Sequence, residues 1–272
     1  MKTVKSLDIG HTVKLADGQP VGIFITYKPE ALQMLGVLKE TLEHIAESEL
    51  PVVHLLTSLP SPGQILCGYV IVDAAGKEDK IKQLIRKIKK LEYVEDVEVY
   101  YPSKSGMLTA TPFDVLKVSG MRGMVWVKPM FKAFIRTFQE MVGTGGSAII
   151  YNMGYIIGKE AFHEHMKIAG SDKREALEVS RNFFKASGLG SVEFRHIDVK
   201  KGKAIVRVYN SFECELFPNI GRPASQFIRG IVAGWISALL EKEVETRETK
   251  CLAKGDPFCE YVIRAVDNSA SF

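Results

Sequence analysis

The stretch that decides the fold is "RPASQFIRGIVAGWISALLEKEVETRETKCLAKGDPFCEYVI", which runs from Arg222 to Ile263. Its first half is apolar at helical spacing, and Gly230 and Gly234 stand one turn apart, which predicts a helix that another backbone can approach closely. Its second half predicts a strand, a tight loop with Gly255 and Pro257 at its tip, and a second strand. We therefore expect a helix followed by a β-hairpin.

The predicted hairpin carries Glu248, Cys251 and Cys259 in the spacing Glu-x2-Cys-x7-Cys. A hairpin can bring both thiolates to one point, and thiolates are preferred zinc ligands that a carboxylate can complete. A disulfide is disfavoured, because clustered cysteines in a cytosolic chain are more often metal ligands or redox groups. The spacing is looser than a zinc-finger Cys-x2-Cys, so a metal site and two ordinary buried cysteines both remain open.

Cys214 is the candidate fourth ligand. It lies near the end of a predicted strand, "KAIVRVYNSFECEL" (203–216), in which alternation places Val206, Val208, Phe212 and Cys214 on the apolar face. Cys214 should therefore face inward, either as a ligand of the same metal or as a small buried hydrophobe.

Composition describes a soluble globular protein of one large or two ordinary domains. The chain has 272 residues, of which 46% are hydrophobic and 25% charged, and a formal net charge of +4. No apolar run is long enough for a membrane span, and the N-terminus lacks an apolar signal core, so we expect a cytoplasmic protein that does not bind a membrane. The most basic stretch, "KIKQLIRKIKK" (80–90), has helical spacing and favours a solvated helix face over direct nucleic-acid binding.

Residues 1–102 predict a βαββαβ unit of ferredoxin-like type. The second element is predicted as one helix over 29–49, with Leu32, Leu35, Leu38, Leu42 and Ile45 on its apolar stripe. This order resembles the ACT family of regulatory domains. The turn after the first strand, "TYKPEAL", lacks the glycine of amino-acid-binding ACT domains, which favours pairing through sheet edges or helices over ligand binding. A linker is predicted over 103–123, packed on a domain surface by its apolar residues.

The second domain is predicted over 124–272, with three helices, two strands, the glycine helix and the hairpin. A second glycine pair, Gly154 and Gly158, lies in a helix predicted over 147–170. Two such helices indicate tight packing inside the domain or at a dimer seam. The helix after it is predicted to begin at Asp172, a suitable N-cap.

The second domain resembles the vinyl-4-reductase domain family. The resemblance rests on the quoted stretch, on "NSFECE" (210–215) before it, and on "AIIYNMGYIIG" (148–158). It implies an α+β chain whose C-terminal domain is a mixed α/β fold with a buried ligand pocket. The family includes sensors of phenols and related aromatics and proteins tied to the 4-vinyl reduction step of bacteriochlorophyll synthesis. Its fold is shared with subunits of a vesicle-tethering complex.

The resemblance also implies a zinc set. Glu248, Cys251 and Cys259 match the family's ligands by position, but the family's remaining cysteine falls on Ser225. A serine hydroxyl is a poor zinc ligand at neutral pH. Either Cys214 replaces the missing cysteine ligand, or the metal is bound weakly or not at all.

Candidate ligand-binding residues are the inward aromatic side chains and one arginine in an apolar helix. They are Phe134, Phe138, Tyr151, Tyr155, Phe212, Arg229 and Trp235. For the aromatic residues ordinary core packing is the alternative, and for Arg229 it is a surface position. His163 and His165 are two apart on a helix, so they face different sides and do not form a metal pair.

Three functions remain open. The first is a small-molecule-binding regulatory or carrier protein, forming a homodimer and holding an apolar or aromatic ligand, with tetrapyrrole included, and a structural zinc. The second is a reductase or accessory protein of tetrapyrrole metabolism. No dinucleotide fingerprint or iron–sulfur cysteine run is present, so we expect no nucleotide cofactor and no identified catalytic residue. The third is a non-catalytic dimeric scaffold, which predicts a filled core without a cavity.

Overall fold

The computed structural model describes residues 12–58, 65–109, 112–118 and 121–266. The chain divides into two compact units, Met1–Met124 and Val125–Phe272, and each is considered by itself. The sequence Pro-Ser-Pro-Gly at 60–63, which predicts a turn between two strands, lies outside the described residues. Among the helices that the structure describes, none combines the length and the apolar character needed to cross a membrane.

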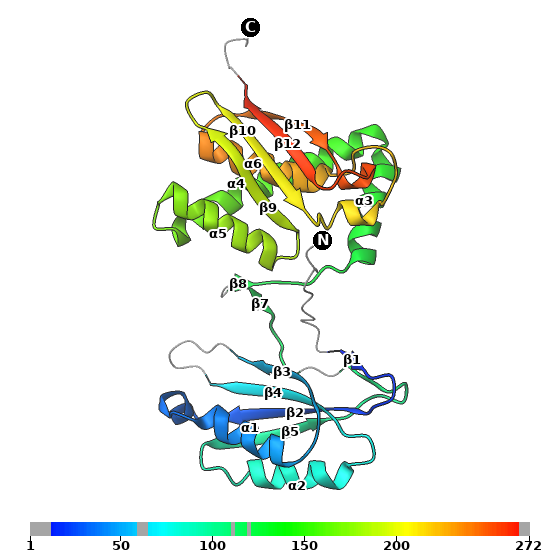
Figure 1. Cartoon of the computed structure of the whole chain (residues 1–272), viewed down its shortest axis with the longest axis vertical. Helices are drawn as coiled ribbons and strands as arrows, with labels where there is room; N and C mark the ends of the chain where they lie inside the picture. Colours follow the sequence, from blue (N-terminus) through cyan, green and yellow to red (C-terminus); the bar gives the residue numbers. More distant parts are fainter. Residues whose placement is uncertain (1–11, 59–64, 110–111, 119–120, 267–272) are drawn as a thin grey trace. The chain divides into compact units, whose positions relative to one another are not determined.

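The first unit has the predicted βαββαβ order, which confirms the ferredoxin-like fold class. Its elements are β2 (Pro20–Tyr27), α1 (Val37–Glu47), β3 (Val52–Thr57), β4 (Cys67–Asp73), α2 (Glu78–Ile88) and β5 (Val94–Tyr100). The strands form one sheet in the order β3-β4-β2-β5, and every neighbouring pair is antiparallel. Helices α1 and α2 cover one face of this sheet (Figure 1) and bury its apolar side chains in a single core.

The opposite face of that sheet is covered in part by the segment predicted as a linker. Short strand β6 (Met107–Leu108) pairs with β1 (Val13–Lys14), and Leu108 is buried against Phe24 and Tyr69. Farther along, β7 (Lys117–Val118) and β8 (Met121–Arg122) pair with each other. Burial of apolar side chains therefore ties this segment to the first unit.

The prediction that the leucines of the first helix form its buried face is wrong. The chain forms a short 3-10 helix over Pro29–Gln33, is interrupted at Gly36 with φ 88°, and begins α1 only at Val37. The side chains that α1 buries are Val37, Thr41 and Ile45. Leu32, Leu35, Leu38 and Leu42 are all exposed. Thr41 can be buried because its hydroxyl donates to Val37 O at 2.9 Å and accepts from Tyr27 Oη at 3.2 Å.

The second unit places helices against one four-stranded antiparallel sheet. Its elements are α3 (Lys128–Val142), α4 (Thr144–Ile168), α5 (Lys173–Ala186), β9 (Ser191–Asp198), β10 (Lys203–Tyr209), α6 (Gln226–Leu240), β11 (Val244–Lys250) and β12 (Cys259–Ala265). The sheet order is β11-β12-β10-β9. Helix α6 lies behind this sheet in Figure 1, and α4 packs along α6. Asp172 caps α5 as predicted, accepting from Arg174 N at 2.7 Å.

Helices α4 and α6 meet through their two glycine pairs. A Cβ atom at Gly154 or Gly158 would collide with the backbone carbonyls of α6, and one at Gly230 or Gly234 would collide with those of α4. Only glycine permits backbones to come this close, since any side chain would hold the helices apart. The glycine pairs therefore serve packing inside the unit, the first of the two alternatives that the sequence left open.

The predicted strand over 203–216 is too long. Strand β10 ends at Tyr209, Asn210 adopts φ 50°, and the chain forms a 3-10 turn over Cys214–Leu216. Strand alternation therefore does not govern Phe212 or Cys214. Val206 and Val208, which lie inside β10, are both buried as predicted. Cys214 is buried instead because the turn that carries it packs beside the hairpin.

Candidate metal centre and ligand cavity

Three cysteines and one glutamate converge in the second unit. Cys214 Sγ lies 3.6 Å from Cys251 Sγ and 3.4 Å from Cys259 Sγ. A carboxylate oxygen of Glu248 joins them, and the four ligand atoms all lie within 4.8 Å of one another. The three cysteines are buried and Glu248 is half-buried. A set of three sulfurs and one carboxylate at this spacing could hold a metal ion.

A β-bulge turns Glu248 and Cys251 to the same side of the sheet. The pairing of β11 with β12 shifts register between Glu248 and Lys250. Side chains of a regular strand alternate between the two faces of the sheet, so Glu248 and Cys251 would point to opposite faces. The bulge inserts one extra residue between them, so both side chains point to the same face. The loop is then fixed by Asp256, whose carboxylate accepts from Cys251 N at 2.8 Å, and by Leu252 N, which donates to Cys259 Sγ at 3.5 Å.

Glu248 provides the test of whether a cation fits. Both of its carboxylate oxygens are buried and neither has a hydrogen-bond partner among the described residues. Burial, together with the negative charge of Cys251, raises the pKa of Glu248 to about 9. Hydrogen bonds from the thiols of Cys214 and Cys259 lower the pKa of Cys251, which makes it the thiolate of the three. A buried carboxylate that accepts no hydrogen bond and lies beside a thiolate has the chemistry of a metal ligand, because a bound cation would supply the missing partner of both groups.

A second buried carboxylate, which the sequence analysis missed, ties the cluster to helix α6. Glu213 is fully buried, and its carboxylate accepts from the backbone N–H groups of Gln226, Phe227 and Ile228 at 2.8–2.9 Å. Burial raises the pKa of Glu213 to about 7, although these three hydrogen bonds oppose the shift. Glu213 precedes Cys214, so the cap on α6 also fixes one candidate ligand. The only feature of the sequence that could have indicated a role for Glu213 is its position next to Cys214.

Ser225, at the position where the resemblance implies a cysteine ligand, has another partner. Its hydroxyl forms a hydrogen bond with the hydroxyl of Tyr261, and both side chains are buried. The fourth position of the cluster is taken by Cys214 instead. The structure thus answers the geometric question that the sequence raised, because Cys214 reaches the hairpin.

The residues predicted to bind a ligand fall in separate places. Phe134, Phe138 and Phe212 pack together in an aromatic cluster around Phe131. Tyr155 donates its hydroxyl to the carboxylate of Glu243 at 2.6 Å. Tyr151 and Arg229 line an open groove beside β11, and of the seven only Trp235 lines a mostly apolar cavity, which is partly open to solvent. The structure therefore does not bring the seven residues to one site.

The cavity beside Trp235 has a volume of about 200 Å³. It lies among α4, α5, α6 and β9, and its walls are mostly apolar. The lining residues are Ile157, Ala161, His165, Ser180, Phe183, Phe184, Ser187, Leu189, Val192, Phe194, Ile231, Val232 and Trp235. Trp235 is held between the rings of Phe162 and Phe194, each 5.2 Å away between centroids. Its position is therefore fixed by packing.

His165, which lines this cavity together with the polar Ser180 and Ser187, was not recognised as a candidate ligand residue in the sequence analysis. Trp235 Nε1 donates a hydrogen bond to His165 Nδ1 at 3.1 Å, and both side chains are buried. An indole N–H can only donate, so Nδ1 carries no proton and the remaining ring proton lies on Nε2. Burial lowers the pKa of His165, which keeps the imidazole neutral at neutral pH.

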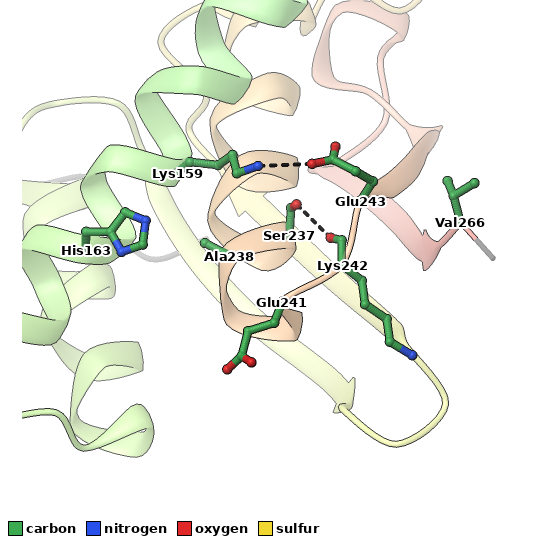
Figure 2. A pocket seen from close by; sticks show the side chains of 8 residues that line it. All are labelled: Lys159, His163, Ser237, Ala238, Glu241, Lys242, Glu243 and Val266. Carbon is green, nitrogen blue, oxygen red and sulfur yellow. Dashed lines mark hydrogen bonds and ion pairs between the residues drawn. The ribbon is translucent and has the colours of Figure 1, made fainter. Parts of the chain in front are cut away.

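A different hollow, of about 530 Å³, lies at the C-terminal end of α6. Figure 2 shows that its polar groups bind one another: Lys159 pairs with Glu243 at 3.0 Å, and Ser237 donates to Lys242 O at 2.7 Å. The ammonium group of Lys242 is directed away from these residues. Lys159 and Glu243, two of the charged residues that line this hollow, thus neutralise each other.

Comparison with known proteins gives the following matches. The model of the V4R domain family matches residues 204–265. A Methanocaldococcus jannaschii protein is 30% identical over 125 residues, covering 46% of this chain and 68% of the relative. The phenol-responsive sensory domain of the transcription activator PoxR, solved with phenol, is 18% identical with a TM-score of 0.49, covering 56% of this chain and 81% of that domain. The ACT domain of a GTP pyrophosphokinase of Chlorobium tepidum is 17% identical with a TM-score of 0.26, covering 30% of this chain and 97% of that domain.

Proposed function

The chain belongs to the V4R domain family, and from that premise we propose that it is a small-molecule-binding regulatory or carrier protein. Residues 125–272 bind an apolar, single-ring ligand in the cavity beside Trp235. A structural metal ion, zinc by the chemistry of its ligands, is held by Cys214, Glu248, Cys251 and Cys259. The metal fixes the hairpin and the start of α6, and α6 forms one wall of the cavity.

The observation that carries this proposal is the cavity itself. A scaffold with a filled core, the alternative that the sequence left open, predicts no such space. An apolar cavity of about 150 Å³ is large enough for benzene, and the cavity beside Trp235 is of comparable size, about 200 Å³. Its apolar walls favour an aromatic ligand, and the Nε2–H of His165 supplies one donor for a polar substituent. A tetrapyrrole is far larger than this space.

The metal part of the proposal rests on ligand chemistry. Three thiolates and one carboxylate are a soft, tetrahedral donor set of the kind that zinc prefers. Such a site would contribute folding free energy, because the unfolded chain does not hold the four ligands together. The predicted homodimer stays a prediction of the sequence.

The cavity predicts that small aromatic molecules quench or shift the fluorescence of Trp235. Titration with phenol, indole and toluene should give saturable binding of at least one of them to the wild-type chain. Ala161 lines the cavity, and Ala161→Phe should fill it and abolish the signal. Ala148→Phe places the same ring on an exposed position of α4 and serves as the matched control. Equal binding by both variants, or no binding to the wild type, would refute the cavity as a ligand site.

His165 predicts a pH dependence of stability. Its pKa in the folded chain is lowered by burial, so the neutral form stabilises the fold. This contribution is complete above the unfolded-state pKa of about 6.5 and is lost as the pH falls from there through the lower folded-state pKa, at ~1.4 kcal/mol per unit of pKa shift. His165→Gln keeps an acceptor for Trp235 but does not titrate. Urea unfolding at several pH values should therefore show a steeper loss for the wild type below about pH 6.5. Parallel curves would contradict the assignment.

A further inference from the structure

The exposed face of α4 carries an uncharged stripe, formed by Ile149, Asn152 and Ile156, that lines neither the cavity nor the metal cluster. Residues 141–158, which include the first half of α4, contain no charged side chain. Ile149 is 38% exposed and Ile156 is 62% exposed, and Asn152 between them is exposed as well. Apolar side chains that gather on one exposed face, unlike single ones, mark a surface that another molecule covers.

The stripe lies on the side of α4 that faces away from α6. A helix turns by about 100° per residue, so Ile156, two positions from both Gly154 and Gly158, lies almost opposite them. The glycines pack on α6, which directs the stripe to solvent. The neighbouring helix α5 has an ordinary surface instead, because its exposed positions are mostly charged: Lys173, Arg174, Glu175, Glu178 and Lys185.

The spacing of the stripe is that of a seam between two helices. Its steps of three and four residues are those of the a and d positions in a coiled coil. An asparagine at one such position fixes the register of the pair, and its amide both donates and accepts hydrogen bonds. Two Asn152 side chains therefore complement each other across a two-fold axis, whereas two like charges at that place would repel.

Charge at the two ends of the stripe is complementary in the same way. Glu160 is exposed and forms no ion pair with the residues that the structure describes, since Lys159 beside it pairs with Glu243. It lies as far after Asn152 as the first residue of α4 lies before it. At that N-terminus Gly143 supplies no side-chain cap, and the first turn contains no acidic residue. The partial positive charge of a helix N-terminus is stabilised by a carboxylate.

We propose that α4 pairs with α4 of a second copy of this chain, antiparallel and about a two-fold axis near Asn152. Such an axis lets the same patch serve both copies. It sets Ile149 of each copy beside Ile156 of the other, because Asn152 lies between the two isoleucines. It also brings each Glu160 to the first turn of the other α4. Met141, 79% exposed near the end of α3, extends the apolar surface beside that turn. This dimer goes beyond the proposed function, since neither the cavity nor the metal cluster takes part in it.

Sedimentation equilibrium of the full chain tests this seam. The wild type should form a dimer, or a larger assembly if another surface also pairs, and Ile156→Lys should halve its mass by placing like charges in the seam. Because Ile156 is mostly exposed and lysine favours a helix, the variant should stay folded, which circular dichroism checks. Ile168→Lys is the matched control, since it makes the same change at an exposed isoleucine of α4 outside the stripe and should leave the mass unchanged.

Cross-linking tests the position of the two-fold axis. In a Cys67→Ser background, whose other cysteines are buried, Asn152→Cys should give a disulfide-linked dimer with diamide, because only a residue near the axis faces its own copy. Ile168→Cys should not. Glu160→Gln should weaken association by about threefold or more, and by less at high salt.

Three results would overturn the proposal. The first is a wild type that stays monomeric at its highest soluble concentration. The second is an assembly whose mass Ile156→Lys leaves unchanged, which would place the seam on another surface. The third is equal cross-linking through positions 152 and 168, which would indicate random collision.

Discussion

Replacing Cys259 with serine is expected to abolish metal binding and to lower the free energy of unfolding by several kcal/mol. The Cys259 thiol is fully buried within 3.4 Å of Cys214 Sγ, and a serine hydroxyl in its place is a poor zinc ligand. A metal present at about 1,000 times its dissociation constant stabilises a fold by ~4 kcal/mol, and this contribution is lost when the ligand set is broken. Elemental analysis and urea unfolding with and without a chelator measure both effects.

Cys67→Ser is the matched control for this prediction. Cys67 is the one cysteine of the chain that does not belong to the cluster, and it lies half-buried at the start of β4 in the first unit. Its substitution should change neither the metal content nor the effect of the chelator. Cys214→Ser then distinguishes a ligand from a buried neighbour, because replacing Cys214 lowers the metal content only if Cys214 is a ligand. A wild-type chain whose stability does not respond to a chelator would contradict the metal site.

The sequence predicted the parts of this site that are local in the chain. Glu248, Cys251 and Cys259 lie in one hairpin, so their spacing alone brings them near one another. Cys214 comes from a turn that strand alternation cannot describe, because the chain leaves β10 after Tyr209. Its approach to the hairpin depends on where that turn packs, which is a tertiary property. Glu213 was missed for the same reason, since its partners are backbone groups of a helix about a dozen residues away.

The fold shows the same division between local pattern and tertiary packing. The strands of the first unit were predicted because their β-branched and aromatic runs are continuous. The leucine stripe failed because Gly36 interrupts the helix and shifts its start to Val37, so the buried face became that of Val37, Thr41 and Ile45. A polar Thr41 on that face could not be expected from hydropathy, as its burial depends on the hydroxyl of Tyr27. His165 likewise became recognisable only beside Trp235.

Gly234→Ala is expected to destabilise the second unit by about 3 kcal/mol or more, although alanine normally stabilises a helix relative to glycine by about 1 kcal/mol. The added Cβ would collide with the backbone carbonyl of Tyr155 in α4, and a backbone group cannot rotate away as a side chain can. The helices must therefore separate. Urea unfolding should show the loss, and the neighbouring Trp235 should report a change in fluorescence because the wall of its cavity moves.

Gly145→Ala tests the same substitution on α4 away from the crossing. A Cβ there meets only the side chain of Val142, at 3.3 Å, so the variant should be as stable as the wild type or more stable. Gly154 and Gly230 contact each other's helices, and their double alanine variant should lose less stability than the sum of the two single variants. Once the first Cβ has separated the helices, the second finds part of its space already open. Additive losses, or a Gly234→Ala variant as stable as Gly145→Ala, would show that the glycines do not set the helix spacing.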